Sequence, residues 1–281
     1  MTDFLRRLWV AVVLIPVLLA GLYLDASPWS ILAMAAIATM FAQDEFLRMA
    51  LPVRAEDREG PLRLVVVGLL GGAISCLPTI YAHQGNGAGE VMAPLLSLGV
   101  VVVAATMLLR RHHLQHAGRH MAACIASLLY VPLLACVWSL IKLEFGPNWL
   151  FMTLALAFLS DTVAYIFGRL WGRHKLYPAV SPGKTVEGSV GGVVGGVLAT
   201  VGAGSLWLVP ELPLKHALVL GVLGSLVGQV GDLFESMLKR GYGVKDSSAL
   251  LGAHGGMLDR VDALLFVAPV VYYYVHLVVR A

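Results

Sequence analysis

The sequence predicts an all-α, polytopic integral membrane protein with about nine transmembrane helices, and three observations carry this prediction. First, 58% of the 281 residues are hydrophobic and only 13% are charged, whereas a soluble domain has about 25% charged residues. Second, the apolar residues form runs close to the ~20 residues that a helix needs to cross a bilayer. Third, Lys and Arg gather in alternate loops between these runs, as expected of a multi-pass topology.

Short polar loops separate the apolar runs, so each run is assigned to one membrane span. The runs lie roughly at residues 6–24, 29–50, 62–82, 90–109, 120–143, 148–170, 187–209, 213–235 and 259–279. The first run is interpreted as a membrane helix, because it is longer than the ~7–15-residue apolar core of a cleaved signal peptide. We expect one membrane domain, residues 1–281. Within it, residues 1–145 would serve packing, dimerisation or lipid access, and residues 146–281 would carry the catalytic helices and cytoplasmic motif loops.

The distribution of cations predicts the orientation. All Lys and Arg residues except Lys142, Lys215 and Arg280 fall on one side of the predicted membrane. Cytoplasmic loops carry an excess of these residues, so we expect the N-terminus and the polar motif loops in the cytoplasm. The expected location is the bacterial cytoplasmic (inner) membrane.

One polar stretch, residues 236–262, stands out among the apolar runs, and we call it the signature segment. With Glu235 just before it, it gathers cations, carboxylates and glycines, the groups that bind phosphate oxygens and divalent metals. On the eighth helix, Asp232, Glu235, Ser236 and Lys239 follow i, i+3, i+4, i+7 spacing and form one polar stripe. Asp259 and Asp262 share one face at the start of the ninth helix.

Two carboxylates lie inside apolar runs, Asp161 in the sixth and Asp232 in the eighth. Such residues are costly in a bilayer and usually face a polar cavity that has a function. The loop between the last two helices makes convergence of Asp232 and Asp259 plausible. Two carboxylates with water and substrate phosphate are typical Mg²⁺ ligands.

A second polar segment, residues 160–188, carries Arg169, Arg173, Lys175 and Lys184 on the cytoplasmic side. Pro178, Pro182 and Gly183 break helices and predict an extended turn. Its Gly-Lys-Thr sequence lacks the upstream glycine and the strand of a P-loop. The glycines that follow at four-residue spacing, such as Gly188, Gly192 and Gly196, predict close helix packing.

Fixed spacings in both polar segments match one family pattern. The family's signature runs Ser-x-apolar-Lys-Arg, four residues, Lys-Asp, a spacer, and His-Gly-Gly-apolar-x-Asp-Arg-apolar-Asp. It is matched by Ser236, Leu238, Lys239, Arg240, Lys245, Asp246, Ser248, Leu251, Gly252, His254, Gly255, Gly256, Met257, Asp259, Arg260, Val261 and Asp262. The upstream segment matches at Ser160, Asp161, Ala164, Tyr165, Gly168, Arg169, Ser181, Pro182, Lys184, Thr185, Glu187 and Gly188. The chain therefore resembles the phosphatidate cytidylyltransferases, or CDP-diglyceride synthetases, although Gly252–Ala253 stands where Pro-Gly is common.

The resemblance implies the Mg²⁺-dependent reaction CTP + phosphatidate → CDP-diacylglycerol + pyrophosphate, in phospholipid biosynthesis. It implies a homodimer in a lipid membrane and no nucleic-acid partner. Asp232 and Asp259 match the family's metal ligands; Asp161 and Asp246 are further candidate ligands, and a second cation is an open alternative. The candidate catalytic residues are Asp232, Asp259, Asp246, Lys239, Arg240 and His254. The candidate substrate-binding residues are Asp161, Arg169, Lys175, Ser181, Lys184, Lys245 and Arg260.

Several alternatives stay open at this point. A CTP-dependent polyprenol or phytol kinase would pass the γ-phosphate to a lipid alcohol, and a transporter would use the intramembrane carboxylates without consuming CTP. His254 either donates to a phosphate oxygen or supports the Gly-Gly turn. The histidines His112, His116 and His120 indicate either a metal site or, as we prefer, a basic interfacial segment. Polar residues near the end of the second run are expected at the interface or facing a cavity: Gln43, Asp44, Glu45 and Arg48.

Overall fold

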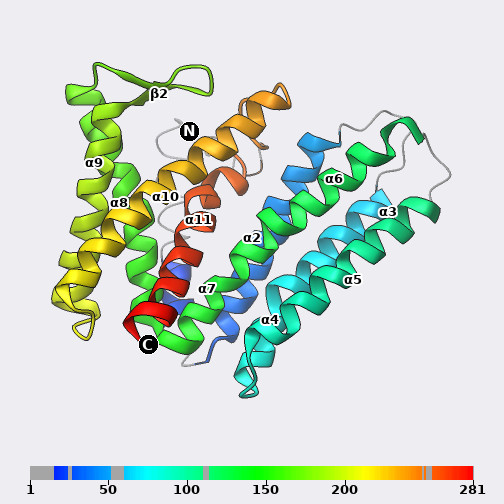
Figure 1. The fold of residues 1–281 in the computed structure, drawn as a ribbon, viewed down its shortest axis with the longest axis horizontal. Coiled ribbons are helices and arrows are strands. Elements are labelled where there is room, and N and C mark those ends of the chain that lie inside the picture. Colours follow the sequence, from blue (N-terminus) through cyan, green and yellow to red (C-terminus); the bar gives the residue numbers. More distant parts are fainter. Residues whose placement is uncertain are drawn as a thin grey trace. The chain divides into compact units, whose positions relative to one another are not determined.

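The fold is helical and its long helices are those of a multi-pass membrane protein (Figure 1). A computed structural model describes residues 16–24, 27–51, 60–109, 114–248, 250 and 255–280. Within these residues, eight helical stretches are long and apolar enough to cross a membrane. They correspond to the second through ninth predicted spans, which confirms the fold class. Most of the first predicted span, residues 6–24, lies outside the described residues.

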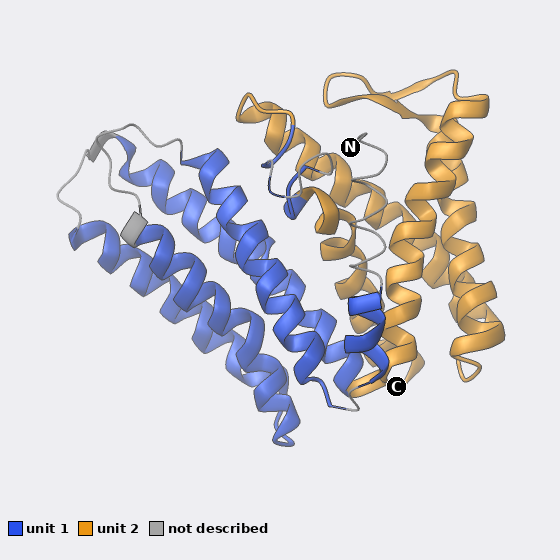
Figure 2. Cartoon of the chain, turned by 180° about the vertical axis from the view of Figure 1, so that it is seen from behind, with its two compact units in different colours: residues 1–143, 246–258 blue, residues 144–245, 259–281 orange. Residues whose placement is uncertain are grey.

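The chain divides into two compact units, residues 1–143 with 246–258 and residues 144–245 with 259–281 (Figure 2). Part of the signature segment therefore clusters with the N-terminal helices. The two units differ from the two expected parts, residues 1–145 and 146–281, in that residues 246–258 belong to the first unit.

The first unit is built from α2 (Trp29–Ala50), α3 (Gly60–Arg63), the π-helical segment η1 (Leu64–Gly71), α4 (Gly72–His83), α5 (Ala88–Leu109), α6 (Leu114–Tyr130) and most of α7 (Pro132–Phe145). Buried polar side chains join its helices. The Gln43 amide donates to Ser127 Oγ over 3.2 Å, and the Thr79 and Ser139 hydroxyls are 2.7 Å apart. Such bonds satisfy polar groups that water cannot reach.

The second unit contains α8 (Pro147–Trp171), α9 (Val186–Val197), η2 (Leu198–Leu208), α10 (Leu214–Gly241), α11 (Leu258–Tyr274) and η4 (Val275–Val279). Pro147 lies in the first turn of α8, where its missing N–H costs nothing. Thr185 caps α9, because its hydroxyl accepts the Gly188 N–H over 3.1 Å. The helix α10 continues to Gly241, so the polar stripe of residues 232–239 is helical as predicted.

The loop after α8 forms a short antiparallel hairpin of β1 (Lys175–Tyr177) and β2 (Ser181–Thr185). Sequence reasoning expected only an extended turn there. Glu187 ties the loop to α9, because its carboxylate accepts the backbone N–H groups of Arg173 and His174. These bonds hold the start of the hairpin against the first turn of α9, which directly follows the last hairpin residue, Thr185.

The predicted packing role of the α9 glycines is confirmed. A Cβ added at Gly192 would lie 2.8 Å from the Gln229 amide nitrogen of α10, and one at Gly188 would lie 2.9 Å from the Ala164 carbonyl oxygen of α8. One at Gly196 would lie 2.6 Å from the Gly221 carbonyl oxygen. Small residues let these backbones approach closely.

Gly196→Ala is expected to lower the free energy of unfolding by about 1–3 kcal/mol, because the new methyl group would press on backbone that cannot move aside. The measurement is the apparent melting temperature in detergent, which should fall by several degrees. Gly202→Ala is the matched control, since nothing lies within 4 Å of a Cβ built there. Equal melting temperatures for the two variants would contradict the packing account.

Candidate functional site

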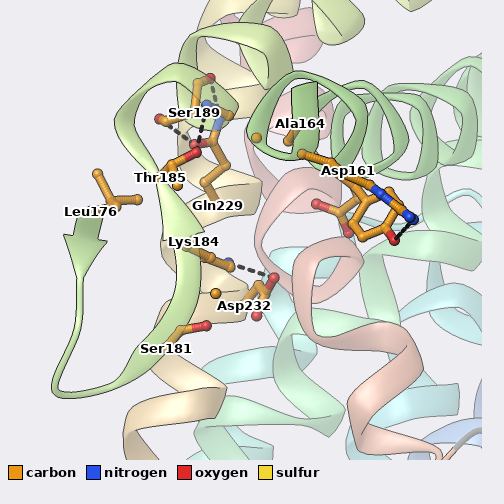
Figure 3. A pocket seen from close by; sticks show the side chains of 14 residues that line it. Asp161, Ala164, Leu176, Ser181, Lys184, Thr185, Ser189, Gln229 and Asp232 are labelled. Carbon is orange, nitrogen blue, oxygen red and sulfur yellow. Dashed lines mark hydrogen bonds and ion pairs between the residues drawn. The ribbon is translucent and has the colours of Figure 1, made fainter. Parts of the chain in front are cut away.

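An open cavity of about 500 Å³ lies within the second unit, among α8, the hairpin, α9 and α10 (Figure 3). Five residues predicted from the sequence as site residues line it: Asp161, Arg169, Ser181, Lys184 and Asp232. The lining also includes Ala164, Tyr165, Gly168, Leu176, Gly183, Thr185, Gly188, Ser189 and Gln229. The second polar segment of the sequence thus meets Gln229 and Asp232 of α10 at one place, and no described residue of the signature segment lines this cavity.

An ion pair between Lys184 and Asp232 forms the charged part of this cavity. Lys184 on β2 points toward Asp232 on α10, and its Nζ lies 2.5 Å from Oδ2 (Figure 3). Both side chains are about one quarter exposed, so water and a ligand can reach them. Thr185, the residue after Lys184, caps α9, which fixes where the lysine leaves the backbone.

Two further carboxylates belong to the same electrostatic group. Asp161 on α8 interacts with the charges of both Asp232 and Lys184. Asp262 on α11 interacts with Asp161, Asp232 and Lys184, and only 9% of it is exposed. A Cβ at Gly231 would lie 2.8 Å from the Asp262 carbonyl oxygen, so the close approach of α10 and α11 at Gly231 places Asp262 beside this group.

Neutral polar groups from α9 and α10 complete the lining. The Ser189 hydroxyl donates to the Gln229 amide oxygen, and the Gln229 amide nitrogen donates to the Ser189 carbonyl oxygen over 3.2 Å. Sequence reasoning missed Gln229 and Ser189. Gln229 carried a usable signal, because it precedes Asp232 by three residues in an apolar helix and therefore shares its face.

A second charged cluster in this unit centres on Lys239. Its Nζ lies 2.6 Å from Glu235 Oε2 and 2.7 Å from Asp259 Oδ1. The three side chains are largely buried, with 12% of Lys239, 1% of Glu235 and 9% of Asp259 exposed. Sequence reasoning paired Asp259 with Asp232, whereas in the structure each of these carboxylates bonds to a different lysine.

Other predicted site residues are placed outside the cavity lining. Lys175 Nζ donates to the Pro182 carbonyl oxygen, and Arg240 donates to the carbonyl oxygens of Val180 and Val244. Lys245 and Arg260 are exposed. Asp246 belongs to the other compact unit, and His254 lies outside the described residues.

The carboxylates of the cavity suit a hard divalent cation. Among the residues that the structure describes, no three His, Cys, Asp or Glu side chains stand close enough to form a complete metal site. The described histidines of α6 form no such group either: the His116 and His120 rings stack, and His112 lies outside the described residues. Mg²⁺, however, is usually held by one or two carboxylates with water and substrate phosphate. Asp232, with Asp161 and Asp262 nearby, fits that requirement.

The fold and the cavity define a multi-pass membrane protein with a cation–carboxylate site suited to phosphate groups. The chain belongs to the cytidylyltransferase family, because the family model described as "Cytidylyltransferase family" matches residues 5–278.

Several relatives of known name are similar to this chain, and they share one name. A protein of Staphylococcus epidermidis named phosphatidate cytidylyltransferase is 34% identical over 203 residues, which cover 70% of this chain and 76% of that protein. A protein of the same name from Staphylococcus saprophyticus is 34% identical over 205 residues, covering 73% of this chain and 76% of the relative. One from Staphylococcus aureus is 36% identical over 177 residues, which cover 62% of this chain and 65% of the relative.

Proposed function

We propose that this protein is a phosphatidate cytidylyltransferase, which converts CTP and phosphatidate into CDP-diacylglycerol and pyrophosphate in phospholipid biosynthesis. Membership of the cytidylyltransferase family and the names of the relatives support this activity. The observation that carries it is the cavity lined by Lys184, Arg169, Asp161 and Asp232, with the charge of Asp262 acting on both aspartates, in a unit built of membrane-spanning helices. A reaction between a lipid phosphate, which stays in the membrane, and a nucleotide, which is dissolved in water, requires a site at the boundary between the two.

The chemistry needs charge neutralisation more than a base. A phosphatidate oxygen, already ionised at neutral pH, attacks the α-phosphorus of CTP; the bond to the β-phosphate breaks and pyrophosphate leaves. Catalysis of such a step depends mainly on positioning and electrostatic stabilisation. In our proposal Lys184 and Arg169 hold phosphate oxygens in the cavity, and Ser181 donates a hydrogen bond to them.

Mg²⁺ is the proposed cofactor, and when bound it would offset the charge of the phosphates. Asp232 would hold it, with Asp161 and Asp262 as neighbouring carboxylates. Lys184 must then release Asp232 when the substrates bind. In that exchange the Lys184 ammonium group would move from Asp232 to a phosphate oxygen, and Mg²⁺ would take its place beside Asp232.

The lysine cluster of α10 is proposed to act beside the cavity. Lys239, held by Glu235 and Asp259, would orient Asp259, which remains a candidate metal ligand. Arg240, Lys245 and Arg260 are proposed to attract the triphosphate and the leaving pyrophosphate. His254 and Asp246 keep their proposed roles near the phosphates.

The acyl chains are proposed to lie along α8. Two apolar side chains there, Ile166 and Leu170, are 44% and 65% exposed. They directly follow Tyr165 and Arg169, which line the cavity. A phosphatidate headgroup in the cavity would therefore have lipid-facing surface next to it.

The cytoplasmic side of the bacterial inner membrane is the proposed location of this site. The excess of Lys and Arg in alternate loops supports this orientation, and CTP is cytoplasmic. A homodimer in the membrane is proposed as the assembly.

The test supplies the purified protein in detergent with CTP, phosphatidate and Mg²⁺, and follows pyrophosphate and lipid product by mass. We expect CDP-diacylglycerol and pyrophosphate in equal amounts, and neither when phosphatidate or Mg²⁺ is left out. CDP release with phosphorylation of an added polyprenol would identify a kinase instead. Movement of lipid substrate without CTP consumption would indicate a transporter.

A further inference from the structure

We propose that Glu45 on α2 is a positioning residue for the reaction, because its carboxylate joins the two flanks of a chain segment, and each flank adjoins a candidate site residue. This inference rests on the proposed function. The flanks are Ser247 with Ser248 on one side and Met257 with Leu258 on the other. We call Glu45 with these four residues the carboxylate clamp.

Both carboxylate oxygens of Glu45 take part in the clamp. Glu45 Oε1 accepts the Ser248 hydroxyl over 2.6 Å and the Met257 N–H over 2.9 Å. Glu45 Oε2 accepts the Ser247 hydroxyl over 3.0 Å and the Leu258 N–H over 2.8 Å. Each oxygen therefore bonds to both flanks, and the carboxylate bridges them twice. All five residues lie in the first compact unit (Figure 2).

Burial makes these hydrogen bonds hard to replace by water. Glu45 is 4% exposed, Ser247 is 7% exposed and Leu258 is fully buried. A Cβ built at Gly256 would collide with Ser247 Oγ and with the Glu45 carboxylate, so the flanks come together only with glycine there. A buried donor left without a partner costs far more than an average hydrogen bond contributes.

The neighbours of the clamp give it a place in the reaction. Asp246 directly precedes Ser247, and Asp259 directly follows Leu258. Both are candidate site residues, and Glu45 holds the residue next to each. Small errors in the placement of catalytic groups are expensive, since a shift of about 1 Å can lower a rate about 100-fold. Glu45 therefore acts on the reaction through Asp246 and Asp259, and it touches no substrate itself.

Glu45→Gln is the most direct variant. It keeps the shape of the side chain, but either orientation of the amide sets an NH₂ group against a backbone N–H that now donates to an oxygen. We expect kcat for CDP-diacylglycerol formation to fall about 100-fold, with KM for CTP changed less than about threefold. Both constants are measured on protein that elutes as a single peak in size-exclusion chromatography. Loss of folding alone would reduce the amount of that peak but leave kcat per folded molecule unchanged.

The matched control is Asp44→Asn. Asp44 is the preceding residue on α2 and bonds to Arg48 and Arg63. The substitution therefore removes a negative charge next to Glu45 and leaves the hydrogen bonds of the clamp in place. Its kcat should stay within about twofold of the wild-type value. An equal loss of kcat in Asp44→Asn and Glu45→Gln would overturn the proposal.

A second readout does not depend on activity. Trypsin cleaves after exposed Lys245, next to the Ser247 flank, and a released flank should be cut faster. We expect Glu45→Gln to raise the rate of this cleavage about tenfold or more, with Asp44→Asn at the wild-type rate. An active enzyme in which Glu45→Gln changes neither kcat nor cleavage refutes the clamp but leaves the proposed function intact. A folded wild-type protein that makes no CDP-diacylglycerol refutes the proposed function itself, and with it the catalytic role of Glu45.

If Glu45→Gln fails to fold, Ser247→Ala and Ser248→Ala carry the test. Each removes one hydroxyl and leaves the carboxylate and the backbone donors in place. We expect kcat to fall several-fold in each, with the effects of the two substitutions not independent, because both act on one carboxylate. Wild-type kcat in both variants would overturn the proposal.

Discussion

Asp232→Asn is expected to lower kcat for CDP-diacylglycerol formation roughly 10²- to 10³-fold while the protein remains folded. The loss follows from removing one charge from a preorganised site. Asp232 bonds to Lys184, shares the charged group of Asp161 and Asp262, and is the proposed Mg²⁺ ligand of the cavity. Asn keeps the volume of the side chain but lacks the negative charge that both partners require. The measurement is steady-state formation of lipid product at several Mg²⁺ concentrations.

The dependence on Mg²⁺ separates a metal ligand from a partner of Lys184 alone. If Asp232 holds Mg²⁺, the concentration for half-maximal activity should rise in Asp232→Asn, and high Mg²⁺ should restore part of the rate. Lys184→Met provides the comparison, because it should lower activity without raising the Mg²⁺ requirement. A rate in Asp232→Asn near that of the wild type would show that the Asp232 carboxylate takes no part in the reaction.

Lys239→Met is expected to have the largest effect on stability. Lys239 lies between the buried carboxyl groups of Glu235 and Asp259, so its removal takes away the cation that both groups share. Breaking a buried ion pair from one side costs about 3–5 kcal/mol. For a chain of this size that corresponds to a fall of roughly 10 °C in melting temperature, which thermal unfolding in detergent measures.

The double variant Lys239→Met with Glu235→Gln tests the cause. It replaces one of the two neighbouring buried carboxyl groups by a neutral amide, so it should recover a substantial part of the lost melting temperature. Lys215→Met is a matched control, because Lys215 is an exposed lysine near the start of the same helix. A fall of only a few degrees in Lys239→Met, similar to that of Lys215→Met, would contradict the importance of the cluster.

The spans could be predicted closely because a bilayer imposes one simple pattern on the sequence. The prediction of residues 148–170 corresponds to α8 (Pro147–Trp171), and that of residues 187–209 to the continuous stretch Val186–Leu208. The glycines of α9 were assigned to packing for the same reason, since spacing alone defines a helix face. By contrast, the hairpin at residues 175–185 is short and contains Pro182, so neither alternation nor strand propensity indicated it.

The partners of the site residues were less accessible to sequence reasoning. Spacing along a helix shows which residues share a face, but it does not show which helix that face meets. For this reason Asp259 was paired with Asp232, whereas the close approach of α10 and α11 at Gly231 places Asp262 in the charged group of the cavity. Asp262 was recognised as a neighbour of Asp259 on one face and as the last position of the family signature, but it was not predicted as a site residue.

Glu45 shows the same limit over a longer distance. It was one of four polar residues near the end of the second span, with an interface and a cavity as alternatives. In the structure Gln43 and Glu45 are buried, and Asp44 pairs with Arg48 and Arg63. The bonds of Glu45 reach residues more than 200 positions away in the chain, and no local pattern identifies such partners.

Radiolabelled CTP tests most directly whether the cytidylyl group of CTP, with its α-phosphorus, passes to a lipid phosphate. The purified protein is given phosphatidate, Mg²⁺ and CTP labelled either at the α- or at the γ-phosphorus, and lipid is separated from the aqueous phase. We expect the α-label to enter the lipid and the γ-label to leave as pyrophosphate. Transfer of γ-label to a lipid alcohol, with α-label retained in CDP, would contradict it.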